Sequence, residues 1–357
     1  MTGAHDRPAI SMAVPRPLHR LESVTPLVRL NGARALVTGG AGFVGSTIVD
    51  QLVDAGASRV VVIDDLSRGR HENLQTVGKH PALRLVAGDI CDASLVDSMT
   101  IDIDFVFHQA ALRITQCAEE PVRAIKVMVE GTQNVLEAAV RHKVTKVILA
   151  SSASVYGEPD SLPMRESAPF RNRTLYGAAK IANEQMARAY AEMYGLPYLA
   201  LRPFNVYGPR MDAFGVYTEV MIRWLERLAR SEQPMIFGDG TQTMDFVFVR
   251  DVARANLLAA VAEVSDDVLN VGTGVETSLN ELCRLLCDAT GHPNLEPVRG
   301  EARKVNGVMR RRASIERARE VIGFEAKTSL REGLAELVAW YGSLAGRTQF
   351  PQPAQVS

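Results

Sequence analysis

The sequence predicts an α/β fold, with a doubly wound parallel sheet and a smaller α/β lobe toward the C-terminus. Short apolar runs, each the length of a buried strand, occupy residues 35–37, 59–63, 83–87, 104–108 and 146–150. Helical stretches alternate with them, as at residues 43–55 and 121–142, where apolar residues recur at the spacing of one helix face. Parallel strands need such crossovers and are covered on both faces, so the alternation indicates βαβ units.

The pattern becomes less regular after residue 205. A short strand is expected at residues 235–237, and we expect the apolar run at 246–249 to return to the first sheet. Helices are expected at residues 217–230, 251–261, 278–290 and 329–341. These later elements predict the smaller lobe.

Composition and charge exclude several classes of protein. Of the 357 residues, 46% are hydrophobic and 23% charged, which is typical of a globular chain. Forty basic and 41 acidic residues give a net charge of −1, so no basic excess indicates a nucleic-acid partner. No apolar run reaches the roughly 18 residues that a membrane span needs. Residues 1–30 contain four prolines and lack the apolar core of a secretory signal, so we expect a flexible extension there.

The cysteines point to a reducing compartment. There are four of them, too few and too scattered for a disulfide scaffold. Cys283 and Cys287 lie in an apolar helical run and are predicted to be buried thiols rather than metal ligands. We therefore expect a cytoplasmic protein without a metal site and without a membrane partner.

A glycine-rich turn, TGGAGFVG at residues 38–45, follows the first predicted strand and opens a helix. Gly39, Gly42 and Gly45 stand at three-residue spacing, while a register starting at Gly40 fits G-x-G-x-x-G. In either register the missing side chains let the backbone turn tightly and approach a pyrophosphate at the helix N-terminus. The context is typical of a Rossmann-type dinucleotide site.

An acidic residue, Asp64, closes the second predicted strand. A carboxylate there accepts hydrogen bonds from both ribose hydroxyls and would repel a 2′-phosphate. The position predicts NAD rather than NADP, although Arg68 and Arg70 nearby favour the opposite choice.

The third and fourth strands end in residues suited to the adenosine half of the cofactor. Asp89 and Ile90 follow the third strand, where a carboxylate and the backbone can meet the adenine. The fourth strand runs into Gln-Ala-Ala at residues 109–111, whose small side chains permit a close backbone approach. Arg113 lies just beyond and can reach a cofactor phosphate, with a solvated loop arginine as the equal alternative.

Three residues carry the predicted chemistry. Tyr176 and Lys180 are four residues apart at the start of a predicted helix, so both project from one face. An ammonium beside a phenol, together with a positive nicotinamide, is expected to lower the phenol pKa from about 10 toward neutrality. Such a tyrosine acts as a general base on a hydroxyl, and Ser152 at a neighbouring strand end can hydrogen-bond the same oxygen.

From about residue 33 to 341 the chain resembles the extended short-chain dehydrogenase/reductase family, in its nucleotide-sugar epimerase/dehydratase branch. Besides the residues above, the resemblance rests on the following motifs: GDI at Gly88, HQAA at His108, SSASVYG at Ser151, RPFNVYGPR at Arg202 and IFGDGTQTMDFV at Ile236. It implies homodimers formed through residues 121–142 and 178–194. It also implies an NAD-binding domain of residues 31–204 plus 240–272, a nucleotide-sugar-binding lobe of residues 205–239 plus 273–345, and a C-terminal tail at 346–357.

Spacing and resemblance together predict two groups of binding residues. The cofactor residues are Gly39, Gly42, Phe43, Val44, Gly45, Asp64, Ser67, Asp89, Ile90, Gln109, Ala110, Ala111, Arg113, Tyr176 and Lys180. The substrate residues are Ser151, Ser152, Asn205, Arg210, Phe237, Arg250, Lys304 and Arg310. Met244 stands where the family usually has an arginine on the diphosphate, so another cation is needed, and Arg250, Arg303, Lys304 and Arg310 are the candidates.

The resemblance favours a UDP-sugar 4-epimerase. Dehydratases of the branch carry an Asp-Glu pair after the serine, and decarboxylases carry a glutamate; here those positions are Ala153 and Ser154, which exchange no proton near neutral pH. A 4,6-dehydratase, a 4-ketosugar reductase and a non-enzymatic sensor of NAD or nucleotide sugars are the alternatives.

The substrate is left open between two pairs, UDP-glucose/UDP-galactose and UDP-glucuronate/UDP-galacturonate, with N-acetylhexosamines third. A uronate carboxylate needs hydroxyl and guanidinium donors, which Ser151, Ser152 and Arg210 can supply.

Overall fold

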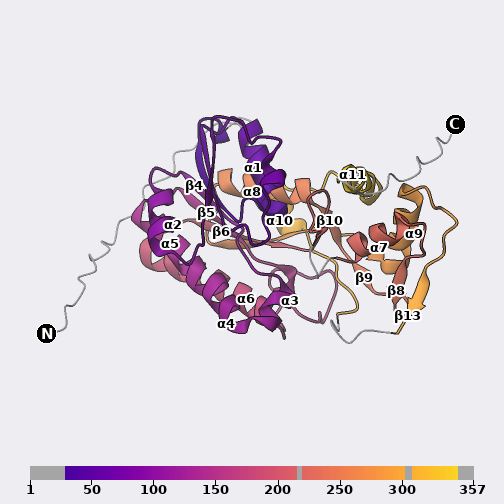
Figure 1. The fold of residues 1–357 in the computed structure, drawn as a ribbon. Helices are drawn as coiled ribbons and strands as arrows, with labels where there is room; N and C mark the ends of the chain where they lie inside the picture. The colour runs from indigo at the N-terminus through magenta and orange to yellow at the C-terminus, as the bar shows by residue number, and fades with distance from the viewer. Residues whose placement is uncertain (1–28, 215–218, 302–307, 345–357) are drawn as a thin grey trace.

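A seven-stranded parallel sheet forms the centre of the molecule, in a computed structural model that describes residues 29–214, 219–301 and 308–344 (Figure 1). The strand order is β11-β6-β5-β4-β1-β2-β3, and every neighbouring pair is parallel. The strands are β1 (Arg34–Thr38), β2 (Arg59–Asp64), β3 (Leu83–Ala87), β4 (Phe105–His108), β5 (Lys146–Ala150), β6 (Tyr198–Pro203) and β11 (Asp267–Val271). The predicted doubly wound Rossmann-type sheet is thus confirmed, and it is extended by β6 and β11.

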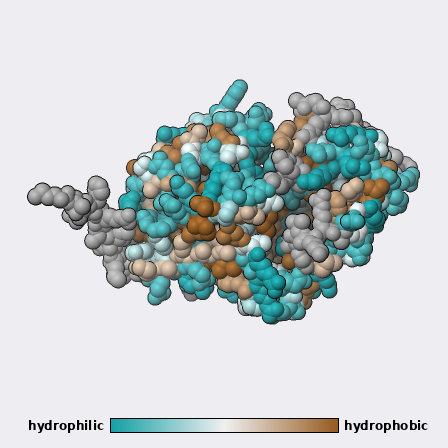
Figure 2. All heavy atoms as spheres, turned by 60° about the horizontal axis from the view of Figure 1, so that its bottom comes forward, coloured by the Kyte–Doolittle hydropathy of each residue, from teal (hydrophilic) through white to brown (hydrophobic). Residues whose placement is uncertain are grey.

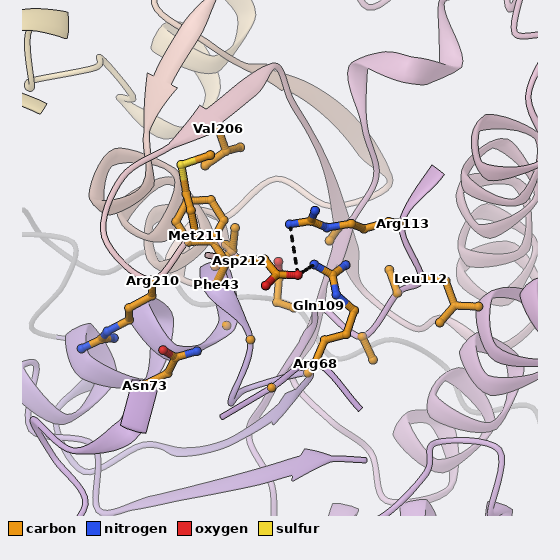
Figure 3. A pocket seen from close by; sticks show the side chains of 18 of the residues that line it. Phe43, Arg68, Asn73, Gln109, Leu112, Arg113, Val206, Arg210, Met211 and Asp212 are labelled. Atoms are coloured by element: carbon orange, nitrogen blue, oxygen red, sulfur yellow. Dashed lines mark hydrogen bonds and ion pairs between the residues drawn. The ribbon is translucent and has the colours of Figure 1, made fainter. Parts of the chain in front are cut away.

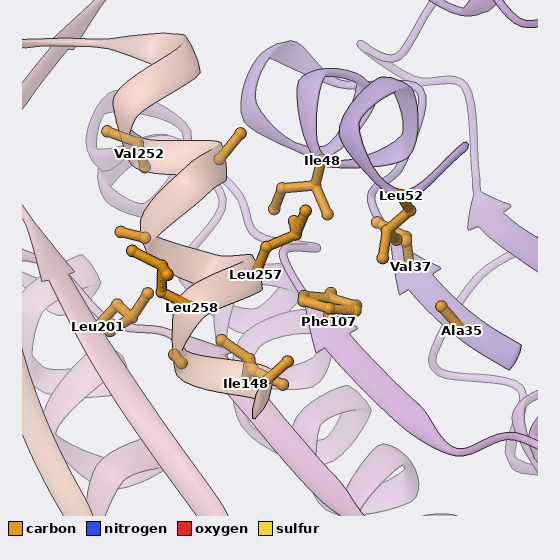
Figure 4. Close-up of a cluster of buried hydrophobic side chains, with 14 of the residues drawn as sticks. Ala35, Val37, Ile48, Leu52, Phe107, Ile148, Leu201, Val252, Leu257 and Leu258 are labelled. Carbon is orange, nitrogen blue, oxygen red and sulfur yellow. The ribbon is translucent and has the colours of Figure 1, made fainter. Parts of the chain in front are cut away.

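Helices cover both faces of this sheet because successive strand residues point to opposite sides. On one face α1 (Phe43–Asp54) and α8 (Val249–Val261) pack together over Val37, Phe107 and Ile148 (Figure 4). On the other face α5 (Gly131–Arg141) and α6 (Leu175–Tyr194) bury their apolar sides over Leu36, Val61 and Leu149. The helix α2 (Ala93–Thr100) packs beside α5.

The predicted helix over residues 121–142 is not a single α-helix. It consists of α4 (Pro121–Ile125), a π-helical turn (Lys126–Glu130) and α5, preceded by the short α3 (Ile114–Glu119). Short 3₁₀ turns follow β2 (His71–Leu74) and β5 (Ala153–Val155).

The C-terminal part of the chain builds a second hydrophobic cluster from α7 (Val220–Leu228), α9 (Leu279–Ala289) and α11 (Leu330–Ser343). Two small sheets accompany them: β8 (Met235–Phe237) with β13 (Val298–Gly300), and β9 (Thr243–Met244) with β12 (Thr277–Ser278). Cys283 and Cys287 are free thiols buried in this cluster, as predicted.

Two elements lie elsewhere than predicted. Residues 246–249 do not return to the main sheet, because β10 (Phe246–Phe248) pairs instead with β7 (Asn205–Tyr207). The helix α10 (Glu316–Ile322), assigned from the sequence to the sugar-binding lobe, packs on β11 and α8. Its buried Ala318 and Ile322 join the core of the main sheet, which explains this placement.

The surface is mixed in character. Figure 2 shows one face on which hydrophilic residues predominate and hydrophobic residues gather toward the middle. Within the described ranges, no helix combines the length and the apolar character needed to cross a bilayer. The predicted extension and tail fall outside the described residues, apart from Arg29 and Leu30.

Candidate functional site

A cavity of about 1470 Å³ opens at the carboxyl ends of the sheet strands. The loops after β1, β2, β3, β4 and β5 line it, and so do β7 and residues 209–214, which come after β6. The strand order reverses between β4 and β1, and ligands of doubly wound sheets bind at such a switch point.

The glycine turn is packed so closely that side chains would not fit. Gly39 has φ +67°, and a Cβ there would lie 2.8 Å from the Ala110 backbone. A Cβ on Gly45 would lie 2.2 Å from the Gly39 carbonyl oxygen. Gly39, Gly42 and Gly45 line the cavity, whereas Gly40 packs against Val62 of β2. The three-residue spacing is therefore the register that faces the ligand, and the turn fits a pyrophosphate against the start of α1.

Asp64 lines the cavity at the end of β2 and is held by the neighbouring backbone. Its two carboxylate oxygens accept hydrogen bonds from the N–H groups of Ala41 and Leu66, both at 2.9 Å. Burial raises the pKa of Asp64, and those backbone hydrogen bonds oppose the rise. Each oxygen retains acceptor capacity for a ribose hydroxyl.

The arginines that favoured NADP in the sequence are engaged elsewhere. Arg68 donates to Asp212 at 2.8 Å, and the guanidinium carbon of Arg70 lies 3.9 Å from the Phe214 ring centroid. Neither arginine is paired with Asp64. The Asp64 carboxylate therefore remains able to accept the ribose hydroxyls and to repel a 2′-phosphate. This arrangement fits NAD.

All of the predicted cofactor residues line the cavity, and the residues that follow β4 are anchored to α8. Gln109 donates its side-chain N–H to Asn256 at 3.0 Å. Outside the glycine turn, Asp64 and the catalytic pair, the lining includes the predicted Phe43, Val44, Ser67, Asp89, Ile90, Gln109, Ala110, Ala111 and Arg113.

An ion bridge that the sequence did not predict crosses this cavity. The Asp212 carboxylate lies 2.8 Å from an Arg68 nitrogen and 4.0 Å from an Arg113 nitrogen (Figure 3). The three residues come from loops after β7, β2 and β4 respectively. The bridge therefore joins parts of the chain that are far apart in sequence.

The three predicted catalytic residues come together at the same edge of the sheet. Thr174 caps α6 by accepting from the Gly177 N–H at 3.1 Å, which fixes the helix start that carries Tyr176 and Lys180. The Lys180 ammonium donates to the Ala150 carbonyl at 2.6 Å and lies 5.7 Å from the Tyr176 ring centroid. Ser152 lines the cavity with Tyr176 and Lys180, and its hydroxyl is close enough to lower the pKa of the Tyr176 phenol.

The acidity of these groups differs from the sequence expectation. Burial raises the pKa of Tyr176 to about 12, and the Ser152 hydroxyl only partly offsets this. Burial also lowers the pKa of Lys180 to about 8. The protein alone therefore does not lower the phenol pKa. The expected fall also depended on the positive charge of a bound nicotinamide.

Ser151 belongs to a buried network rather than to the substrate surface. Although it borders the cavity, its hydroxyl donates to Glu184. Glu184 pairs with Arg202 through two hydrogen bonds of 2.8 and 2.6 Å, and Arg202 also donates to the Tyr156 hydroxyl at 2.8 Å. The prediction that Ser151 donates to the substrate is therefore corrected, because its hydroxyl already donates its hydrogen bond to Glu184.

The other predicted substrate residues are divided between the cavity and its surroundings. Asn205 lines the cavity with a buried side-chain oxygen that has no hydrogen-bond partner. Arg210 also lines it, but its guanidinium turns to α1, where a nitrogen lies 2.7 Å from an Asp50 oxygen. Arg210 therefore ties its loop to the main sheet region and does not offer a free cation.

Three of the remaining candidates do not line the cavity, and two others are not described. Arg250 is exposed and pairs with Glu336 of α11. Arg310 is also exposed and pairs with Glu276 at 2.6 Å. Phe237 lies on β8 against Gly300. Lys304 and Arg303 lie outside the described residues. Arg250, Arg310 and Phe237 thus lie outside the cavity lining, and their assignment to the substrate site stays a prediction.

Sequence reasoning missed several charged residues of the cavity wall; besides Asp212 they include Glu219, Arg223 and Arg311. The side chain of Arg311 is half-buried, and its Nε is buried without a hydrogen-bond partner. Burial lowers the pKa of Arg311 below its ordinary value of 12.5. The only sequence signal was the run of arginines at 310–312, which does not show which of them faces inward.

A family model described as the NAD dependent epimerase/dehydratase family matches residues 35–272. The chain belongs to this family. A UDP-glucose 4-epimerase from Mycolicibacterium smegmatis is 39% identical over 311 residues, which cover 86% of this chain and 98% of that relative. A crystal structure of UDP-glucose 4-epimerase from Thermotoga maritima with UDP-glucose has a TM-score of 0.81 and 37% identity, covering 86% of this chain and 98% of that one. The family's cofactor is NAD, in agreement with the glycine turn and Asp64.

Members of the family with other names are also similar to this chain. A UDP-N-acetyl-alpha-D-glucosaminuronate decarboxylase from Bacillus cytotoxicus is 31% identical, covering 86% of this chain and 97% of that relative. The structure of MoeE5 in complex with UDP-glucuronic acid and NAD has a TM-score of 0.75 and 36% identity, covering 87% of this chain and 99% of that one. The family thus combines one scaffold with several nucleotide-sugar reactions.

Proposed function

We propose that the protein is a UDP-sugar C4 epimerase that works through transient oxidation of the sugar to a 4-keto intermediate. The observation that carries this proposal is the group of Tyr176, Lys180 and Ser152 beside the glycine turn, in a cavity large enough for a dinucleotide and a nucleotide sugar. Epimerases among the relatives support the reaction type.

NAD, when bound here, supplies a reversible acceptor for the hydride at C4 of the sugar. Gly39, Gly42 and Gly45 would hold its pyrophosphate and Asp64 its adenosine ribose.

Tyr176 takes the proton from the sugar O4 and later returns it. Ser152, which lines the cavity with Tyr176, is placed to hydrogen-bond the phenol and to orient the same O4. Lys180, held by the Ala150 carbonyl, keeps an ammonium next to the phenol and stabilises the phenolate as it forms. Rotation of the 4-keto sugar about its diphosphate linkage would present its opposite face to the bound NAD, which would account for inversion at C4.

Elimination of water is the second candidate reaction, because a carboxylate that acts on Tyr176 does border the cavity. Ala153 and Ser154 offer no acid beside Ser152, which favours epimerisation. However, Glu219 lines the cavity and its charge acts on Tyr176. A dehydratase would need such a group to help expel a hydroxyl from the sugar.

The two reactions are distinguished by their products. Incubation with UDP-glucose and with UDP-glucuronate, without added cofactor, is followed by NMR. An epimerase yields the C4 isomer, whereas a dehydratase accumulates a 4-keto-6-deoxy sugar from UDP-glucose. Accumulation of that keto product, or no conversion of any UDP-sugar, would contradict the proposal.

Tyr176→Phe tests the assignment of the base. We expect it to retain NAD, because the loop that binds the cofactor is unchanged, and to lose on the order of 10²- to 10⁴-fold in kcat. Tyr190→Phe, on the same helix but outside the cavity lining, is the matched control and should keep the wild-type rate. A Tyr176→Phe variant that turns over normally would refute the assignment.

The expected assembly is a homodimer in the cytoplasm. The helices implied in pairing carry exposed apolar side chains, with Val122 84%, Ile125 47% and Met193 56% exposed. Light scattering during size-exclusion chromatography tests this, and a monomeric mass would contradict it.

A further inference from the structure

Arg311 is a cation in the cavity wall, and the acidic residue that acts on it, Glu158, forms no ion pair with it. Within the part of the chain that the structure describes, it forms no ion pair, whereas Arg68 is neutralised by Asp212 and Arg210 by Asp50. A buried donor without a partner, such as the Arg311 Nε, destabilises the protein, and more so when the group is charged. A residue in this state is suited to a ligand that supplies the missing anion.

The backbone fixes Arg311 in the wall. The Arg311 N–H donates to the Thr243 carbonyl at 3.0 Å, and the Thr243 N–H donates to the Met309 carbonyl at 2.9 Å. Two residues further on, Ala313 is buried in one cluster with Ala153 and Val155.

The same segment therefore packs against the turn that begins at Ser152. The Met164 N–H donates to the Arg312 carbonyl at 2.7 Å, and Met164 joins the same cluster. Arg311 is thus placed at the end of the cavity where Ser152 and Tyr176 meet the sugar, away from the adenosine end at Asp64.

The position of Arg311 beside the sugar indicates which chemical group of the ligand would bind it. The sugar ring of a neutral UDP-hexose carries only hydroxyls, which would leave the Arg311 guanidinium without an ion-pair partner. A sugar carboxylate supplies two oxygens that match the planar fork of an arginine. The other anion of the substrate, the diphosphate, lies on the nucleotide side of the sugar.

We infer that Arg311 is a specificity-determining residue that binds the carboxylate of a UDP-hexuronic acid. The inference rests on the proposed function, because it takes the sugar of a UDP-sugar to lie beside Ser152. It names the substrate class that the proposed function left open.

Binding measurements test this independently of turnover. Isothermal titration of the full-length, NAD-loaded protein with UDP-glucuronate, UDP-glucose and UDP gives three affinities. We expect the wild type to prefer UDP-glucuronate to UDP-glucose by about tenfold or more. Arg311→Gln should weaken UDP-glucuronate binding on the order of ten- to a hundredfold while UDP and UDP-glucose change by less than about threefold.

Arg310→Gln is the matched control, since it is the same substitution one residue away and removes a guanidinium that faces Glu276 outside the cavity. It should leave all three affinities unchanged. Arg311→Lys keeps the charge without the fork, so an intermediate loss is expected for UDP-glucuronate alone.

Three results would overturn the inference. In the first, Arg311→Gln weakens the binding of all three ligands equally, which would assign the guanidinium to the diphosphate. In the second, it weakens the binding of none. In the third, the wild type binds UDP-glucose more tightly than UDP-glucuronate. The last comparison needs no variant and remains decisive if Arg311→Gln does not fold. Selective binding of UDP-glucuronate without epimerisation would contradict the proposed function but would still support the role of Arg311.

Discussion

Glu184 is the residue on which the wall behind the catalytic turn depends. It lies one helical turn after Lys180, is 2% exposed, and holds the buried Arg202 as well as the Ser151 hydroxyl. A buried ion pair adds little over an apolar pair, but removing one partner leaves the other charge desolvated and alone.

Glu184→Gln should therefore lower the free energy of unfolding by about 3–5 kcal/mol, because Arg202 loses its counter-charge. Urea denaturation followed by circular dichroism measures this. Glu192→Gln, an exposed glutamate on the same helix, is the control and should stay within about 0.5 kcal/mol of the wild type. Equal stability of the two variants would show that the Arg202 pair contributes nothing.

Residues with local spacing were predictable and those with long-range partners were not. Tyr176 and Lys180 can be recognised from their four-residue separation on one helix. Ser152 can be recognised from its place directly after a strand. Arg311 and Asp212 act through contacts with distant loops, and no local pattern marks such contacts. Ser151 was misassigned for the same reason, since its partner Glu184 comes from another element.

Among the elements, the turn between β1 and α1 has the least tolerance for change. Gly45→Ala would place a Cβ 2.2 Å from the Gly39 carbonyl, so the turn must open. We expect the purified variant to lose most of its bound NAD, measured by the cofactor released on denaturation, while the far-ultraviolet circular dichroism stays that of the wild type. Full NAD occupancy in the variant would show that the turn does not set cofactor affinity.

Elements were predictable where periodicity was uninterrupted. The strands β1 to β5 are short apolar runs bounded by turns, and all five lie where expected. The later strand β10 has the same apolar character, but its pairing with β7 is decided by tertiary packing. Likewise α10 joins the main sheet because its apolar face fits there, which composition alone does not show.

For the whole molecule, the Arg68–Asp212–Arg113 bridge connects loops across the cofactor cavity. Burial raises the pKa of Asp212, but the Phe214 N–H and Arg68 outweigh it and hold the pKa below its ordinary value of 3.8. A lowered carboxylate pKa means that the contribution is complete above the ordinary value and is lost as the pH falls through the folded value.

Asp212→Asn should accordingly speed NAD release about fivefold at neutral pH, a modest effect because the pair is partly exposed. Release is measured by dilution and filtration. For the wild type the release rate should stay level between about pH 8 and 5 and rise only below about pH 4. Asp160→Asn, which breaks an exposed pair with Arg171, is the control. A wild-type release rate that already climbs between pH 8 and 5 would contradict the role of the bridge.

An ion bridge that joins three loops across the cavity would slow the escape of a bound NAD. If the protein is the epimerase proposed above, each catalytic cycle would return that NAD in its starting oxidation state. Its turnover would then follow the supply of nucleotide sugar and would be insensitive to the ratio of oxidised to reduced dinucleotide in solution.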